Sequence, residues 1–116
     1  MKLIGRLGFG LAVLVACAAH AADPKPIRFW NLTTSTVVDF RAAPPGTGAW
    51  GANQCANDKD GTVDHDERLR ITGITPGHYD VKLTFKGGSA CTVRNIEMKE
   101  GAVFSIEDKD LTECHK

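Results

Sequence analysis

Short segments of the chain after residue 26 alternate apolar and polar side chains, which is the period of a β-strand with one buried face. The clearest segment is 79–85, in which every second residue from Tyr79 to Phe85 is apolar. Five further segments alternate in this way or are rich in β-branched and aromatic residues: 27–31, 35–41, 69–74, 91–98 and 103–106. The pattern therefore predicts about six strands.

Turn-forming residues separate these segments. Three of the connections are short and carry Gly or Pro, as in Thr75-Pro76-Gly77. Two longer stretches, the Pro- and Gly-rich 43–51 and the acidic 53–67, are predicted to be loops. No window of eleven or more residues after residue 21 has the spacing of an amphipathic helix. We therefore expect an all-β domain over 27–107, a small β-sandwich of six to eight strands, Ig-like in general architecture, with the two loops at its ends.

The start of the chain has a different pattern. A positively charged beginning precedes an apolar run over 7–15, and small residues follow up to Ala21. This order is typical of a secretory signal peptide over 1–21. The run of about nine apolar residues is shorter than the roughly 20 that a bilayer-spanning helix needs. We therefore expect a periplasmic or secreted protein with a polar leader at 22–26 and a C-terminal tail at 108–116.

Cys17 leaves two alternatives open. The run Leu14-Val15-Ala16-Cys17 resembles the lipobox of bacterial lipoproteins, in which the cysteine becomes the acylated first residue. In that case the mature protein carries a lipid anchor. In the other case Cys17 is a small apolar residue near the end of a signal peptide that is cut after Ala21.

The charge balance narrows the range of partners. Removal of residues 1–21 takes away Lys2 and Arg6, which leaves 12 basic side chains against 14 acidic ones and a net charge of about −2. A nucleic-acid-binding domain of this size is expected to carry a basic stripe or a pI above about 9. The sequence shows no local basic window, so we expect no nucleic-acid partner.

Three cysteines follow the signal peptide, and an oxidising compartment favours at least one disulfide between them. Three single pairings of Cys55, Cys91 and Cys114 are open. Cys55–Cys91 is the pairing that the pattern favours, because each of the two borders predicted structure while Cys114 lies near the C-terminus, where chains fray. The remaining thiol would then pair with another molecule, be modified, or stay reduced in the core.

The segment 56–67 resembles the twelve-residue EF-hand calcium loop. Four carboxylates fall at positions where such loops carry oxygen ligands: Asp58, Asp60, Asp64 and Glu67. The match is incomplete, since Ala56 occupies the first ligand position and a predicted strand, not a helix, follows the loop. Two interpretations stay open: a Ca²⁺ site held by these four side chains, and a solvated acidic loop whose Asp-Gly pair favours a turn.

Trp50 lies among glycines in the loop 43–51 and is a candidate for ligand contact, as loop aromatics on rigid scaffolds often are. The alternative that its size favours is a core residue that covers one end of the sandwich. The histidines are not at metal-ligand spacing from one another or from a cysteine. No nucleophile or phosphate-binding motif is present in the sequence, so we expect a protein that is not an enzyme.

Three short motifs occur in order along the chain: Asn31-Leu32-Thr33, P-x-G-x-x-x-W-G over 44–51, and Tyr79-Asp80-Val81. This set resembles small secreted proteobacterial proteins of unknown function, often labelled Tat-signal-like, and the resemblance spans 27–106. It implies a secreted protein and carries over no catalytic or binding residue. Arg6 stands alone where a Tat signal has twin arginines, which favours the general secretory route.

Together these features predict a non-enzymatic interaction module of the periplasm or extracellular space. Long loops on a rigid β scaffold commonly carry binding, so the predicted partner is a protein, a glycan or an envelope component. The alternative is a structural domain that binds Ca²⁺ through 56–67, the one cofactor that the sequence suggests.

Overall fold

A computed structural model describes residues 25–116 of the chain. The predicted signal peptide, Cys17 and the first residues of the leader lie outside the described residues. Nowhere in the described part does a helix reach the length and apolarity that crossing a bilayer requires.

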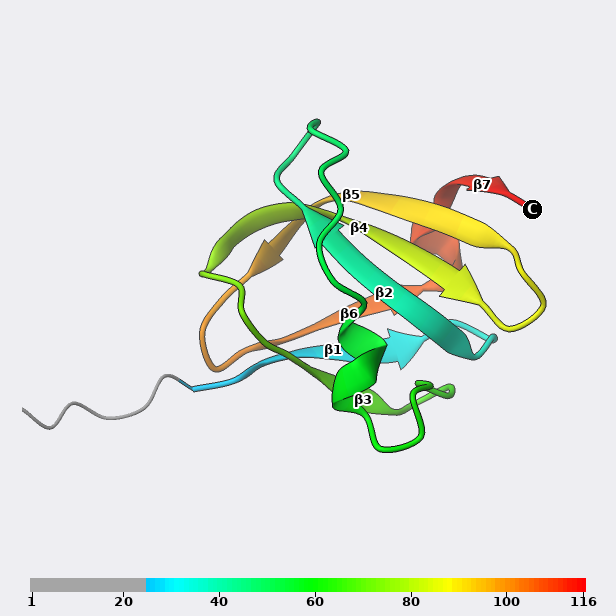
Figure 1. Ribbon diagram of the computed structural model, residues 1–116, viewed down its shortest axis with the longest axis horizontal. Coiled ribbons are helices and arrows are strands. Elements are labelled where there is room, and N and C mark those ends of the chain that lie inside the picture. The colour runs from blue at the N-terminus through cyan, green and yellow to red at the C-terminus, as the bar shows by residue number, and fades with distance from the viewer. Residues whose placement is uncertain (1–24) are drawn as a thin grey trace, which may run out of the picture.

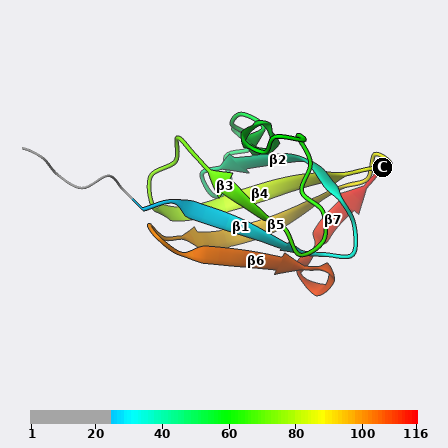
Figure 2. The same ribbon diagram turned by 90° about the horizontal axis from the view of Figure 1, so that it is seen from below.

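The described residues form an all-β fold of two layers (Figures 1 and 2). The elements in chain order are β1 (Ile27–Leu32), β2 (Val37–Ala43), η2 (Gln54–Asn57), β3 (Arg68–Ile71), β4 (Gly77–Phe85), β5 (Ala90–Met98), β6 (Val103–Glu107), η3 (Asp108–Asp110) and β7 (Thr112–His115). Seven strands in two sheets confirm the predicted small β-sandwich of six to eight strands. In this part of the chain the only helical segments are the two 3-10 turns η2 and η3.

The three-stranded sheet has the order β3-β1-β6, and β1 is its centre. β1 runs antiparallel to β3 and parallel to β6. Its side chains alternate as the sequence pattern predicts, with Ile27, Phe29 and Asn31 buried and the residues between them facing outward.

The four-stranded sheet has the order β2-β4-β5-β7, with antiparallel neighbours throughout. The register between β4 and β5 shifts between Tyr79 and Val81, where two residues of β5 are left opposite one of β4. One of these bulged residues, Asn95, has a φ of +56°.

The core lies between the two sheets. Phe29 of the three-stranded sheet and Phe40 of the four-stranded sheet are fully buried, and their ring centroids are 4.9 Å apart. Phe104 lies 5.7 Å from Phe29 and completes an aromatic cluster. Inward-facing aliphatic side chains from both sheets surround this cluster, as the alternation predicts.

The C-terminal segment differs from the expected tail. β7 pairs with β5 through Ala90↔His115 and Thr92↔Thr112, and this places Cys114 beside Cys91. The disulfide therefore joins Cys91 to Cys114. The predicted Cys55–Cys91 pairing was wrong, because Cys55 lies on η2, which packs against β2 and β3, while Cys91 lies on β5 with β7 as its neighbour.

Candidate functional site

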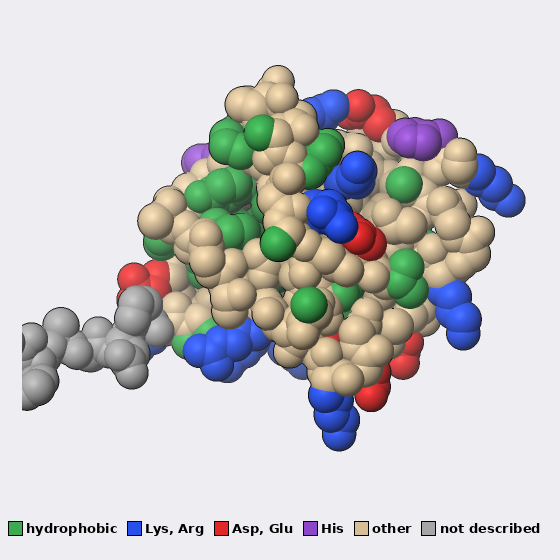
Figure 3. Space-filling view, in the orientation of Figure 1, with side chains coloured by type: hydrophobic (Ala, Val, Ile, Leu, Met, Phe, Trp, Pro, Cys, Tyr) green, Lys and Arg blue, Asp and Glu red, His purple; other side chains and the backbone are tan. Residues whose placement is uncertain are grey.

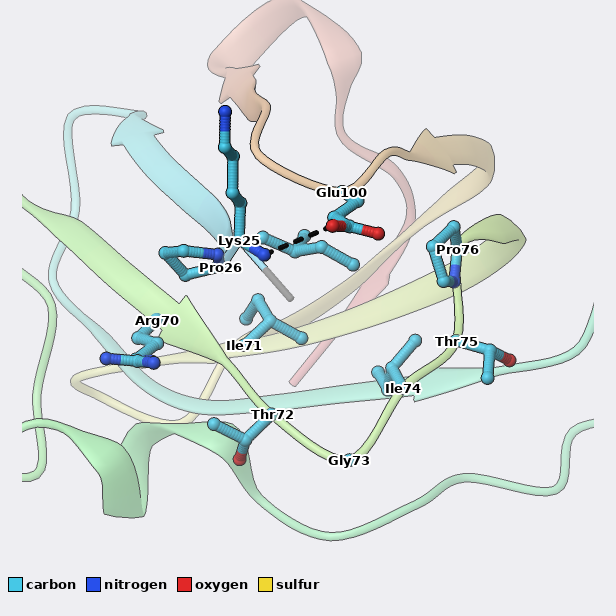
Figure 4. A pocket seen from close by; sticks show the side chains of 11 residues that line it. Lys25, Pro26, Arg70, Ile71, Thr72, Gly73, Ile74, Thr75, Pro76 and Glu100 are labelled. Carbon is cyan, nitrogen blue, oxygen red and sulfur yellow. Dashed lines mark hydrogen bonds between the residues drawn. The ribbon is translucent and has the colours of Figure 1, made fainter. Parts of the chain in front are cut away.

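An open groove lies at the end of the sandwich where the chain enters β1 (Figure 4). Its apolar lining consists of Pro26, Ile27, Ile71, Ile74 and Pro76, and its volume is about 550 Å³. We call this site the end groove. Ile27 and Ile71 are opposite each other in the β1–β3 pair and belong to the inner face of that sheet, so the groove opens onto the edge of the core.

The connection 72–76 forms one side of the end groove. It leaves β3 in one sheet and reaches β4 in the other, so it must cross the open end of the sandwich. Gly73 has a φ of +71°, a conformation that glycine adopts without steric cost. Ile74 follows it and packs against the core with part of its side chain still accessible. The pattern predicted a strand over 69–74, but β3 ends at Ile71. The position of Ile74 between turn residues was the signal in the sequence that it belongs to a connection.

A second, smaller hollow of about 230 Å³ lies on the other side of the same connection. Ala52, Ile74 and Tyr79 are among its lining residues, so Ile74 contributes to both hollows. The Tyr79 hydroxyl donates a hydrogen bond to the Thr75 carbonyl oxygen at 2.6 Å and holds the connection against β4. Figure 3 shows hydrophobic side chains gathered over this connection and over the loop above it.

Three charged side chains stand at the rim of the end groove: Lys25, Arg70 and Glu100. A Glu100 carboxylate oxygen accepts a hydrogen bond from the Lys25 backbone N–H at 3.2 Å (Figure 4). The groove thus combines an apolar interior with three charged residues in its lining, and Figure 4 shows the Lys25 and Arg70 side chains extending outward from it. Such an arrangement suits a ligand with an apolar part and a polar or negative end.

The loop 44–51 is held to the four-stranded sheet by Asp80. The Asp80 carboxylate is buried and accepts hydrogen bonds from the Gly46 and Asn95 backbone N–H groups at 2.9 and 3.0 Å. Arg94 donates a third at 2.8 Å. These donors, with the backbone N–H groups contributing most, lower the pKa of Asp80. The Asp80 carboxylate of the Tyr79-Asp80-Val81 motif therefore contacts Gly46 of the P-x-G-x-x-x-W-G motif.

Trp50 does not cover the end of the sandwich, so the interpretation as a core residue was wrong. The backbone N–H of Gly51 bonds to the Ala42 carbonyl oxygen and returns the loop along β2. This brings the half-buried indole of Trp50 over Lys82, 5.3 Å from its ammonium, on the outer face of the four-stranded sheet. Trp50 is not among the lining residues of the end groove.

The carboxylates of the acidic loop make local hydrogen bonds. Asp58 accepts from the Asp60 backbone N–H at 2.9 Å, Asp64 from the Thr36 hydroxyl at 2.9 Å, and Glu67 from the Asp64 backbone N–H at 2.8 Å. Within residues 25–116 no three acidic, histidine or cysteine side chains are arranged to hold a metal ion. After Glu67 the chain enters β3, so a helix does not follow the loop.

Val63 and Asn31 anchor the acidic loop to the sandwich. Val63 is buried and forms a β-bridge with Val37. The buried Asn31 amide donates to the carbonyl oxygens of Val63 and Ser35, and its own oxygen accepts from Thr33. The N-x-T motif thus fixes the loop by satisfying backbone groups inside the sandwich.

Cys55 is a buried free thiol at the start of η2. Burial, followed by the nearby charges of Asp39 and Asp58, raises the pKa of Cys55 to about 11. The thiolate fraction is therefore very small at neutral pH, and Cys55 belongs to the core rather than to a reactive site.

The sequence did not reveal a cluster of three arginines, because Arg28 is far in the chain from Arg68 and Arg70. Arg28 lies on β1, and Arg68 and Arg70 lie on β3, where each alternates with buried residues. The β1–β3 register places them together on the outer face of one sheet. The alternation in Arg68-Leu69-Arg70 was the available signal, since it places both arginines on one face of a strand although they form no contiguous basic run.

No family model, curated protein or solved structure matches this chain. The function has to follow from the residues and surfaces described above.

Proposed function

We propose that the protein is an exported, non-enzymatic binding module that takes the apolar part of an amphipathic, negatively charged envelope component into the end groove. The observation that carries the proposal is the end groove itself, an open apolar hollow whose lining includes two basic residues, Lys25 and Arg70. Export is part of the proposal and is motivated by the signal-peptide pattern over 1–21.

The size and lining of the end groove support binding of a small apolar group. Its volume of about 550 Å³ falls in the range of roughly 300–1,000 Å³ that is typical of ligand sites. Ile27 and Ile71 are almost fully buried, whereas Ile74 is only partly covered and can gain contacts with a ligand. Burial of apolar surface yields about 25 cal/mol per Å², so an alkyl chain of a few carbons would bind measurably.

The polar groups at the rim support a negative charge on the ligand. Lys25 and Arg70 are exposed, and among the described residues neither takes part in a side-chain ion pair. Glu100 is the one carboxylate in the lining, and it is engaged by the Lys25 backbone N–H. The net charge of the rim is therefore positive.

The same lining favours binding over catalysis. A catalytic groove should contain a nucleophile or a general acid or base held in place by a second polar group. The hydroxyls in the lining are Thr72 and Thr75, and the nearest polar partners of these residues are structural: Asn57 donates to the Thr72 hydroxyl, and Tyr79 donates to the Thr75 carbonyl oxygen.

Isothermal titration with dodecanoate below its micelle concentration tests the proposal. We expect Ile74→Asn to weaken binding by about tenfold, because it replaces an apolar contact worth roughly 1.5 kcal/mol or more. Ile96→Asn is the matched control, since Ile96 is also a partly buried isoleucine packed on the core but lines a different hollow. Equal affinities of the two variants, or no heat of binding for the unaltered protein, would contradict the proposal.

A further inference from the structure

The outer face of the three-stranded sheet carries an arginine face, which we define as Arg28, Arg68 and Arg70 together with Trp30 and Val103. Its residues alternate with buried ones along β1, β3 and β6, so they face away from the core. All three arginines are exposed. Figure 2 shows the three strands of this sheet side by side.

The arginines are close together, and within residues 25–116 none of them forms an ion pair with a carboxylate. Arg28 and Arg70 are directly opposite each other in the antiparallel β1–β3 pair. Like charges in such positions destabilise a sheet, since their Cβ atoms are only about 5 Å apart.

Arginines elsewhere in the described residues are neutralised. Arg41 pairs with Asp39 at 2.9 Å, and Arg94 pairs with Asp80 at 2.8 Å and Glu113 at 2.7 Å. The concentration of positive charge on the arginine face is therefore a local property, on a chain whose basic and acidic side chains number 14 each when these arginines are counted. A negatively charged partner would remove the repulsion between Arg28 and Arg70.

Apolar groups accompany the charges. The guanidinium of Arg68 lies over the Trp30 ring, 4.2 Å from its centroid, and the indole N–H donates to the Asp66 carboxylate at 3.0 Å. Val103 is adjacent to Arg28 across the β1–β6 pair. It is 45% exposed, and no other large hydrophobic side chain within residues 25–116 is exposed. Arginine, an indole and an exposed aliphatic side chain on one surface are the combination found at membrane interfaces.

We propose that the arginine face docks on the surface of an anionic phospholipid bilayer. A bilayer presents many phosphates in one plane, which matches three guanidinium groups spread over one sheet face. Each arginine near such a surface raises the binding constant by roughly fivefold. A soluble polyanion would satisfy the arginines equally well, but it gives no role to the exposed Val103. Arg70 also belongs to the lining of the end groove, so the two surfaces are neighbours.

Co-sedimentation of the purified protein with vesicles tests this proposal. The probes are vesicles of phosphatidylcholine alone and of phosphatidylcholine with 30% phosphatidylglycerol, at low and high salt. We expect binding to the anionic vesicles only, weakened by salt. The triple variant Arg28→Gln, Arg68→Gln, Arg70→Gln should lower the partition coefficient by on the order of 100-fold.

Two measurements keep the test specific. The control variant Lys86→Gln, Lys109→Gln, Lys116→Gln removes the same charge from exposed residues outside the arginine face and should retain most of the binding. The melting temperature of Arg28→Gln should equal or exceed that of the unaltered protein, because the substitution relieves the repulsion from Arg70. This measurement shows whether the fold is kept.

Several results would overturn the proposal. They are equal binding to neutral vesicles, equal losses in the two triple variants, and binding to soluble heparin or duplex DNA without binding to anionic vesicles. This surface does not depend on the end groove: Ile74→Asn should leave vesicle binding unchanged, so the two proposals fail separately.

Discussion

Asp80 shows how one residue can organise a large part of this molecule. Its carboxylate connects the loop 44–51, through Gly46, to the bulge of β5, through Asn95. Arg94 extends the connection to Glu113 on β7, with which it makes two hydrogen bonds of 2.8 and 2.7 Å. A carboxylate with only 3% of its side chain exposed can keep its charge because three donors replace its water.

Asp80→Asn should therefore lower the free energy of unfolding at pH 7 by about 2 kcal/mol. The pKa of Asp80 is lower in the folded state, so its stabilisation is present above the unfolded pKa of about 3.9 and is lost as the pH falls through the folded value. Urea unfolding at pH 7 and at several values below pH 4 measures this. The difference between the variant and the unaltered protein should shrink as the pH falls.

Asp60→Asn is the control for this experiment. The Asp60 side chain is exposed and accepts no hydrogen bond within residues 25–116, so we expect a change below about 0.5 kcal/mol at any pH. A loss in Asp80→Asn that stays constant down to pH 2 would mean that packing, not the charge of Asp80, is responsible.

Among the elements, β7 is the one whose place depends most on a covalent bond. All its residues are exposed, so it buries no apolar side chain that could hold it on β5. Besides the disulfide, the side-chain contacts of the strand are the Arg94–Glu113 pair and the hydrogen bond from the Thr112 hydroxyl to the Thr92 carbonyl oxygen at 2.7 Å. The Cys91–Cys114 bond then closes a chain segment of 23 residues.

Cys114→Ser should lower the free energy of unfolding by about 3 kcal/mol, the stabilisation expected for a cross-link of this loop length. Amide exchange at 111–115 should become fast, because the strand loses its anchor. Peptide mapping of the unaltered, unreduced protein gives the direct check and should recover the peptide that links Cys91 to Cys114. A peptide that links Cys55 to Cys91 would contradict the structure.

Comparison of these elements with the sequence shows what a pattern can reveal. Six strands were predictable because each buries one face, and burial produces alternation that is visible in a single chain. β7 has no buried face and thus no such signal. The disulfide was mispredicted for the same reason. Without a signal for β7, Cys114 was expected to lie in a frayed C-terminus and was therefore left out of the pairing.

The candidate sites were harder to predict, since their residues come from separate strands. Ile27, Ile71 and Ile74 form the end groove only because β1 pairs with β3, and Arg28 meets Arg70 through the same register. In the acidic loop 56–67, Asp58, Asp64 and Glu67 make local hydrogen bonds, and the Ca²⁺ site suggested by their spacing stays a prediction. Spacing along the chain could suggest a ligand set but not whether the ligands converge.

At the scale of the whole molecule, the three-stranded sheet carries both proposed surfaces. Its inner face ends in the apolar end groove, and its outer face is the arginine face, with Arg70 contributing to both. The four-stranded sheet, which contains the long strands β4 and β5, packs against the inner face of the three-stranded sheet. Asp80 fixes the loop 44–51 to the four-stranded sheet. The protein thus presents an apolar site and a positive site at neighbouring positions, as an amphipathic anion requires.

The most direct test is a titration of the ¹⁵N-labelled protein with dodecanoate, followed by amide chemical shifts. We expect the largest changes at the backbone amides that border the end groove: Lys25, Ile27, 71–75 and Glu100. Smaller changes should extend to Arg28 through the β1–β3 register. Shifts confined to the loop 44–51 around Trp50, or spread evenly over the surface, would contradict the assignment of the end groove as the binding site.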